Sequence, residues 1–297
     1  MSARRNGFAR QDGFIIVAVL WILAALAAFA GVFAYYAATT AVSARVSSDR
    51  LQAEALVVSA LELTALQAQG RGENDWRSVG GFSFELGGGG AQVEFRDEAA
   101  RIDLNAAPKA LLAGLFAALG AKPDDAAAYA DRIIGWRKKG EVANQDKEGD
   151  LYKDAGAGYL PREAPFQSLA ELNFVLGLPP ELAQAALPYV TVFSGAPHID
   201  VLAADPVVVR ALPNLSPDAA AVVLDRRGAV PMKALQSLLG RAAENVATEP
   251  GKSMRVNVHA RLPSGRRIRA EAVILLADKD ADPYKILSWR DDFDGAL

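Results

Sequence analysis

The chain has 297 residues, of which 51% are apolar, and a formal net charge of -3 at pH 7. This composition allows one large or two small buried cores and excludes a disordered or fibrous chain. The near-neutral charge gives no overall field for holding nucleic acid, and no local basic patch is obvious in the composition. Zero cysteines exclude disulfides and thiolate metal sites, and two histidines leave little material for acid-base or zinc chemistry.

The first predicted element is a membrane-spanning helix at residues 14–38. These 25 residues carry no charge, and at about 1.5 Å per residue they can cross a hydrocarbon core of about 30 Å. A secretory signal peptide has a shorter apolar region, of roughly 7 to 15 residues, and is disfavoured. Because three arginines outweigh one aspartate before the helix, we expect a cytoplasmic leader at residues 1–13 and a periplasmic body. The chain is thus predicted to be a single-pass inner-membrane protein.

The helix is expected to continue beyond the membrane as a periplasmic half at residues 39–70. The segment from Thr39 to Gln69 contains no proline or glycine and is rich in helix-forming residues, until Gly70 and Gly72 end it. Small and apolar residues recur on one of its faces, which is typical of a helix that packs on another element. We expect that element to be a sheet.

Two β-hairpins are predicted, one on each side of a long helical stretch. They are Phe82–Leu86 with Gln92–Phe95, joined by a glycine run, and Met254–Leu262 with Arg267–Leu276, joined by Pro-Ser-Gly. Residues 71–99 and 248–297 are therefore expected to form one small antiparallel sheet. The fold class is α+β, with a helical domain inserted at residues 100–247.

The predicted insert contains an internal repeat. Pro123-Asp124 matches Pro217-Asp218 at an offset of 94, whereas the apolar positions from Phe166 match those from Met232 at an offset of 66. The first copy therefore carries 94 minus 66, or 28, extra residues, roughly 140–165. Each copy has the pattern helix, tight turn, helix, turn, helix, so we predict a duplicated α-helical unit.

Such units resemble the SAM-like or helix-hairpin-helix fold, which in some proteins binds the DNA backbone. That use needs a glycine pair in the hairpin and nearby basic residues, because the backbone must approach a phosphate closely. The hairpins here lack the glycine pair, and residues 101–240 hold 14 Lys and Arg against 16 Asp and Glu. Packing units are favoured, and no nucleic-acid partner is expected.

Gly13 and Phe14 lie where the charged leader meets the apolar run. A short basic leader that ends in glycine, followed by phenylalanine and some twenty apolar residues, resembles the type IV prepilin signal. The resemblance implies cleavage after Gly13 by prepilin peptidase and methylation of the new N-terminal Phe14. Many such subunits carry a glutamate five residues into the mature chain, where this sequence has Ala18. A subunit without that carboxylate could cap a fibre instead of extending it.

Over nearly its whole length the chain resembles the type II secretion system protein K family of minor pseudopilins. The supporting segments are RIDLNAAPKALLAGLF from Arg101, PFQSLAEL from Pro165 and HIDVLAADPVVVRALPNLS from His198. Leu202 and Asp205 depart from the family pattern in the third segment.

The resemblance implies a pseudopilin fold, a long N-terminal helix packed on a small antiparallel sheet, with the helical insert. It also implies a tip complex with the I-type and J-type minor pseudopilins that initiates and caps the pseudopilus, for export of folded proteins across the outer membrane. The further partners implied are the major pseudopilin, prepilin peptidase and the inner-membrane assembly platform. The alternatives are a minor pilin of a type IV pilus and a membrane-anchored helix-hairpin-helix protein of DNA uptake.

The extra segment holds four carboxylates at close spacing, Asp146, Glu148, Asp150 and Asp154. Oxygen ligands in such a loop are typical of calcium sites, and members of the family bind calcium in this neighbourhood. Residues 137–139 are basic where the family is acidic, so solvated loop charge is favoured and calcium stays an alternative; no other cofactor is expected. No segment offers a nucleophile with a base at recognisable spacing, so we predict that the protein is not an enzyme.

Overall fold

The computed structural model describes residues 12–69, 78–138, 147–277 and 282–293. The chain forms two compact units, Met1–Ala55 and Leu56–Leu297. A single helix, α1 (Asp12–Gln69, 58 residues), contributes to both units and includes the residues predicted as the membrane-spanning helix and its continuation up to Gln69.

The first unit consists of the N-terminal part of α1. Among the described residues α1 is the one helix that is long and apolar enough to cross a membrane, and none of its most apolar window is buried. Where the apolar run ends, the hydroxyls of Thr39 and Ser43 donate within the helix to the carbonyls of Tyr36 and Thr39. A helix so apolar on every side requires an apolar surrounding.

The second unit contains a five-stranded antiparallel sheet with the strand order β1-β2-β5-β6-β7. The strands are β1 (Val79–Leu86), β2 (Gly89–Asp97), β5 (Ser253–Arg261), β6 (Arg267–Leu276) and β7 (Tyr284–Asp291). Both predicted hairpins are present. The first is longer than predicted, since its turn needs only Gly87 and Gly88, which have φ angles of 59° and 80° that favour glycine.

The sequence analysis did not predict the edge strand β7. Its residues are mostly exposed and do not alternate cleanly between apolar and polar, so the period-2 signal is weak. A register shift between Val273 and Ile274 in its neighbour β6 further disturbs the pairing.

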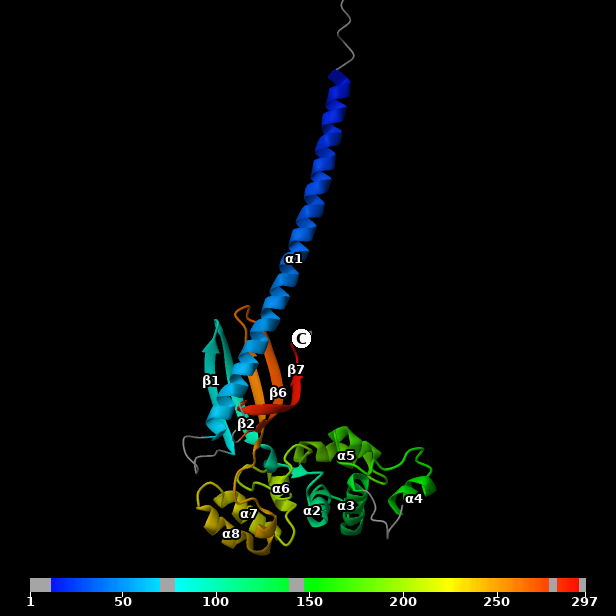
Figure 1. Cartoon of the computed structure of the whole chain (residues 1–297), viewed down its shortest axis with the longest axis vertical. Coiled ribbons are helices and arrows are strands. Elements are labelled where there is room, and N and C mark those ends of the chain that lie inside the picture. The colour runs from blue at the N-terminus through cyan, green and yellow to red at the C-terminus, as the bar shows by residue number, and fades with distance from the viewer. Residues whose placement is uncertain (1–11, 70–77, 139–146, 278–281, 294–297) are drawn as a thin grey trace, which may run out of the picture. The chain divides into compact units, whose positions relative to one another are not determined.

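Alternate side chains of the sheet form an apolar inner face and a polar outer face. Val93, Val258 and Ala270 stand in one cross-strand row of the inner face and are buried. The C-terminal part of α1 crosses the sheet (Figure 1), and its Leu56 and Leu61 side chains are buried as well. The fold class predicted from the sequence, a long helix on an antiparallel sheet with a helical insertion, is confirmed.

The insertion leaves the sheet after β2 and returns at β5. Its described elements, in chain order, are η1 (Glu98–Ala100), β3 (Ile102–Asp103), α2 (Lys109–Ala118), α3 (Pro123–Arg137), α4 (Lys147–Asp154), η3 (Leu169–Phe174), α5 (Pro180–Ala186), η4 (Leu187–Tyr189), β4 (Val190–Thr191), α6 (Pro206–Arg210), α7 (Pro217–Arg226), α8 (Met232–Leu239) and η5 (Gly240–Asn245). All of these elements except η1 contribute to one apolar core.

The two halves of the insertion contain equivalent contacts. Ile102 pairs in parallel with Val190 at the end of the first half, and Ile199 pairs in parallel with Val246 at the end of the second. Helices α2 and α6 pack on each other. Gly114 of α2 touches Ala211 so closely that an added Cβ would lie 1.9 Å from the Ala211 carbonyl oxygen.

Candidate functional site

The membrane end of the chain holds the predicted processing site. Gly13 is the second residue of α1, and Phe14 is 78% exposed. The leader before Asp12 lies outside the described residues. Cleavage after Gly13 and methylation of Phe14 therefore stay predictions.

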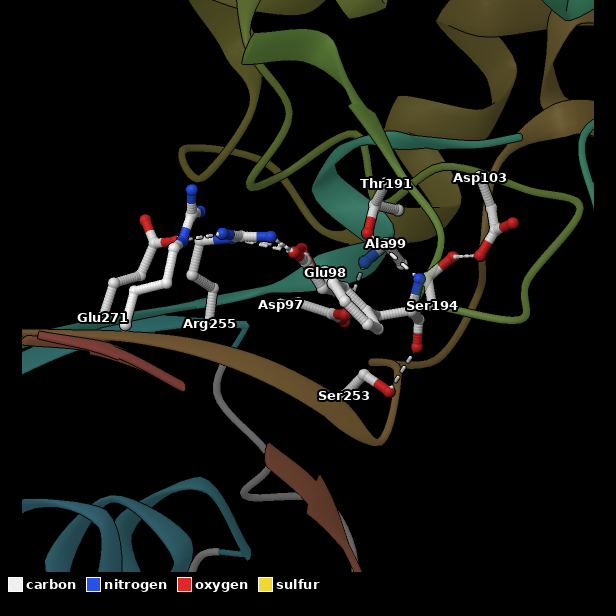
Figure 2. Close-up of polar contacts among 11 residues, drawn as sticks. Asp97, Glu98, Ala99, Asp103, Thr191, Ser194, Ser253, Arg255 and Glu271 are labelled. Carbon is white, nitrogen blue, oxygen red and sulfur yellow. Dashed lines mark hydrogen bonds and ion pairs between the residues drawn. The ribbon is translucent and has the colours of Figure 1, made fainter. Parts of the chain in front are cut away.

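A buried polar junction joins the sheet to the insertion, and Asp97 is at its centre (Figure 2). Strand β2 ends at Asp97, whose carboxylate accepts hydrogen bonds from the backbone N–H groups of Ala99, at 2.8 Å, and Gly251. Burial raises the pKa of Asp97 to about 6 against the lowering effect of these two bonds, and the nearby carboxylates of Asp200 and Glu98 raise it further.

The next residue, Glu98, forms a buried ion pair with Arg255 of β5. Arg255 Nε donates to Glu98 Oε1 at 2.8 Å, and its Nη1 donates to Glu271 Oε1 at 2.6 Å (Figure 2). Burial raises the pKa of Glu271, but Arg255 and Arg290 outweigh it and hold this pKa below its ordinary value. Removing one partner of such a pair costs about 3–5 kcal/mol, because the other charge is left buried and unpaired.

Two further hydrogen bonds tie the sheet to the insertion, and a third ties the second half of the insertion to η1. Ser253 Oγ donates to the Phe193 carbonyl at 2.8 Å, and Arg96 Nη1 donates to the Ala203 carbonyl at 3.1 Å. The Asp200 N–H donates to the Ala99 carbonyl at 2.7 Å. The charges of the junction are thus held in ion pairs and hydrogen bonds that fix its position.

The sequence analysis did not predict this junction. Glu98 and Arg255 are 157 residues apart, and each belongs to a segment that reads as an ordinary strand or strand end. The one local signal was Asp97, which follows an alternating strand and lies shortly before two alanines in the pattern of a helix N-cap.

Each half of the insertion begins with an Ile-Asp pair, and the two aspartates are bonded differently. Asp103 Oδ1 accepts from the Asn105 N–H at 2.7 Å, while its Oδ2 accepts from Ser194 Oγ at 3.0 Å and the Gly195 N–H at 2.7 Å. Asp200 Oδ1 accepts from the Leu202 N–H at 2.9 Å. Asp200 Oδ2 is buried without a hydrogen-bond partner among the described residues.

An arginine at the end of the second helix closes the same turn in each half. Arg137 donates to the carbonyls of Leu104 and Ala107, and Arg227 donates to those of Val201 and Ala204. Burial lowers the pKa of Arg137, an effect that the charge of Asp103 opposes.

The predicted calcium candidates are dispersed. Glu148 forms an ion pair of 2.8 Å with Arg132, and burial raises its pKa. Asp150 pairs with Lys153 on the exposed side of α4, Asp154 is exposed at the end of this helix, and Asp146 lies outside the described residues. The part of the chain that the structure describes contains no group of three or more His, Asp or Glu side chains suited to a metal. Calcium binding stays a prediction that this arrangement of carboxylates does not favour.

Two comparisons with known proteins find relatives of this chain. The family described as "Type II secretion system (T2SS), protein K" matches residues 92–195, which run from β2 to just beyond β4. A solved structure described as the GspK-GspI-GspJ complex from the enterotoxigenic Escherichia coli Type 2 Secretion System has a similar fold, with a TM-score of 0.60 and 18% sequence identity. The similarity covers 85% of this chain and 98% of that chain. No curated protein matches.

The family segment includes the junction residues Asp97 and Glu98, the first Ile-Asp turn and the extra segment with α4. The resemblance to type II secretion system protein K drawn from the sequence is confirmed over residues 92–195, and the fold is similar over most of the chain. Among the described residues, α1 is the one helix whose length and composition suit a membrane anchor, and it lies near the N-terminus.

Proposed function

We infer that the chain is a type II secretion system protein K, a minor pseudopilin that sits at the tip of the pseudopilus. The observation that carries this inference is the family match to residues 92–195, which fall largely within the insertion that interrupts the sheet. The fold similarity to a GspK-GspI-GspJ complex supports it.

In this proposal the apolar part of α1 anchors the chain in the inner membrane, with the sheet and insertion in the periplasm. Prepilin peptidase cuts after Gly13, and the new N-terminal Phe14 is methylated. The partners are the I-type and J-type minor pseudopilins, the major pseudopilin and the inner-membrane assembly platform. The chemistry of the buried junction, which consists of paired charges, suits a scaffold and not an enzyme.

The tip position follows from two features together. Ala18 stands where an extending subunit carries a glutamate, so a subunit above could not pair its N-terminal amine there. The insertion adds a helical domain between β2 and β5, and its bulk would obstruct a further subunit. The protein would thus initiate and cap the pseudopilus for export of folded proteins across the outer membrane.

The test is the intact mass and N-terminal sequence of the membrane-extracted protein from its own host, with and without prepilin peptidase. We expect a chain that begins at methylated Phe14 when the peptidase is present and at Met1 when it is absent. A chain that begins at Met1 in both strains would overturn the proposal. Co-purification with I-type and J-type pseudopilins then separates secretion from a type IV pilus, whose minor pilins would be recovered instead.

A further inference from the structure

Four arginines occur within nine residues, at 261–269, in the second hairpin, and no acidic residue interrupts them. The sequence had indicated no local basic patch, because the arginines are diluted by the acidic remainder of the chain. Three of them, Arg261, Arg267 and Arg269, are exposed, and among the described residues their side chains form no hydrogen bond or ion pair. The fourth, Arg266, donates to the Phe293 carbonyl.

Strand register brings like charges into direct opposition on the outer face of the sheet. Arg261 of β5 stands opposite Arg267 of β6, and His259 stands opposite Arg269. Like charges that face each other across two strands are destabilising. The Arg261–Arg267 pair therefore weakens the hairpin unless something anionic lies over it.

A hollow of about 1330 Å³ lies over the same residues. Gly88, Gly89 and Gly90 contribute to its lining, but a Cβ at Gly89 would instead meet the Arg261 carbonyl oxygen at 2.9 Å and Leu56 at 3.1 Å. Packing does not require glycine at position 90: an added Cβ would have its nearest contact at 3.7 Å, an ordinary van der Waals distance. Gly90 stands between Glu85 and Arg261 in one cross-strand row, so its missing side chain leaves room beside that guanidinium.

We propose that this arginine face, defined by His259, Arg261, Arg267 and Arg269, binds an acidic segment of a partner protein. Charge complementarity selects carboxylates, and residues two apart along β6 repeat at about 7 Å, the spacing of alternate side chains in an extended peptide. Glu85 and Asp292 also line the hollow and interrupt its positive charge. A phosphate backbone, with a charge at every nucleotide, suits such a face less well than an extended peptide, whose carboxylates alternate between its two faces. The inference does not depend on the secretion role.

The test measures binding of a fluorescein-labelled deca-glutamate peptide to the full-length protein in detergent micelles, by fluorescence anisotropy over a salt series. We expect saturable binding that weakens as salt rises. The double variant Arg261→Gln/Arg269→Gln should raise the Kd about tenfold. The matched control Arg241→Gln removes an exposed arginine of η5 and should leave the Kd unchanged.

A second pair of variants tests the hollow without removing an arginine. Gly90→Glu places a carboxylate beside Arg261 that competes with the peptide, and should weaken binding, whereas the neutral Gly90→Gln should weaken it less. Absence of peptide binding by the unaltered protein, or equal binding by the double variant, would overturn the proposal. So would tighter binding of a labelled ten-nucleotide thymidine oligomer or of phosphatidylglycerol vesicles than of the peptide.

Discussion

The two halves of the insertion have the same opening turn, yet only the first satisfies its aspartate fully. Asp103 is bonded through both oxygens, the second by Ser194 and Gly195 from the connection between the halves. Asp200 Oδ2, by contrast, has no hydrogen-bond partner in the described ranges. The backbone N–H of Asp200 instead bonds the sheet junction at Ala99. Duplication thus supplied two equivalent aspartates, of which the first holds the halves together and the second faces the sheet.

The largest expected effect on stability is the difference between substituting Asp103 and substituting Asp200. Asp103→Ala leaves several partly buried donors without an acceptor, and should lower the free energy of unfolding by about 3–5 kcal/mol. Asp200→Ala removes one side-chain hydrogen bond together with an oxygen that had no partner, and should lower the free energy of unfolding by about 1 kcal/mol. Urea unfolding of the detergent-solubilised chain measures both. Equal costs would contradict the difference between the halves.

The next prediction concerns the pH dependence that Asp97 confers. Its folded-state pKa, about 6, lies above the ordinary value of 3.8. The folded state therefore binds more protons at Asp97 than the unfolded state between these values. The contribution of Asp97 to stability is fully present below about pH 4 and is lost as pH rises through about 6, by up to about 3 kcal/mol.

Two variants isolate this contribution from that of other carboxylates. Asp97→Asn should flatten the fall in stability with pH. Asp200→Asn should reduce it in part, because the Asp200 charge raises the pKa of Asp97. Unfolding free energies at pH 4, 5, 6 and 7 give the comparison. A profile for Asp97→Asn that parallels the unaltered protein would show that this carboxyl does not titrate in the window.

A smaller effect is expected where α2 and α6 meet. Gly114→Ala places a Cβ on the Ala211 carbonyl oxygen, which cannot move without shifting the backbone. We expect a loss of about 1–3 kcal/mol, as for overpacked cores. Gly135→Ala is a useful comparison, because the atoms nearest to the added Cβ belong to the Glu148 side chain and not to backbone, although the change would disturb the Glu148–Arg132 ion pair. If Gly135→Ala lowers the free energy of unfolding more than Gly114→Ala does, then close packing of α2 on α6 is not the reason that position 114 needs glycine.

The smallest effect is expected from calcium. Because Glu148 is engaged by Arg132 and Asp150 by Lys153, addition of calcium or of a chelator should leave Tm unchanged within the error of the measurement. A rise in Tm that saturates with calcium would show instead that the carboxylates of the extra segment rearrange around the ion.

Hydrophobic periodicity and turn residues were enough to predict most of the fold. The long helix, both hairpins and the repeated Pro-Asp helix starts were readable because each is specified by residues close in sequence. The paired Glu98 and Arg255 were not, since nothing local marks a contact across 157 residues. The arginine face was equally hidden: Arg261 and Arg267 look like ordinary outward strand residues until register sets them opposite each other.

The insertion has a consequence for the order of folding. Strand β2 pairs with β5 at Asp97 and Met254, so the two central neighbours of the sheet are separated by the whole helical domain. During synthesis the β2 edge of the first hairpin therefore stays unpaired until the ribosome has synthesised the whole helical domain and β5. A folded insertion shortens the effective loop, because its ends are already held close, and lowers the entropic cost of closing the sheet. The helices of the insertion would then pack before the sheet forms. A variant that slows this helix packing should leave the edge of β2 exposed to aggregation for longer.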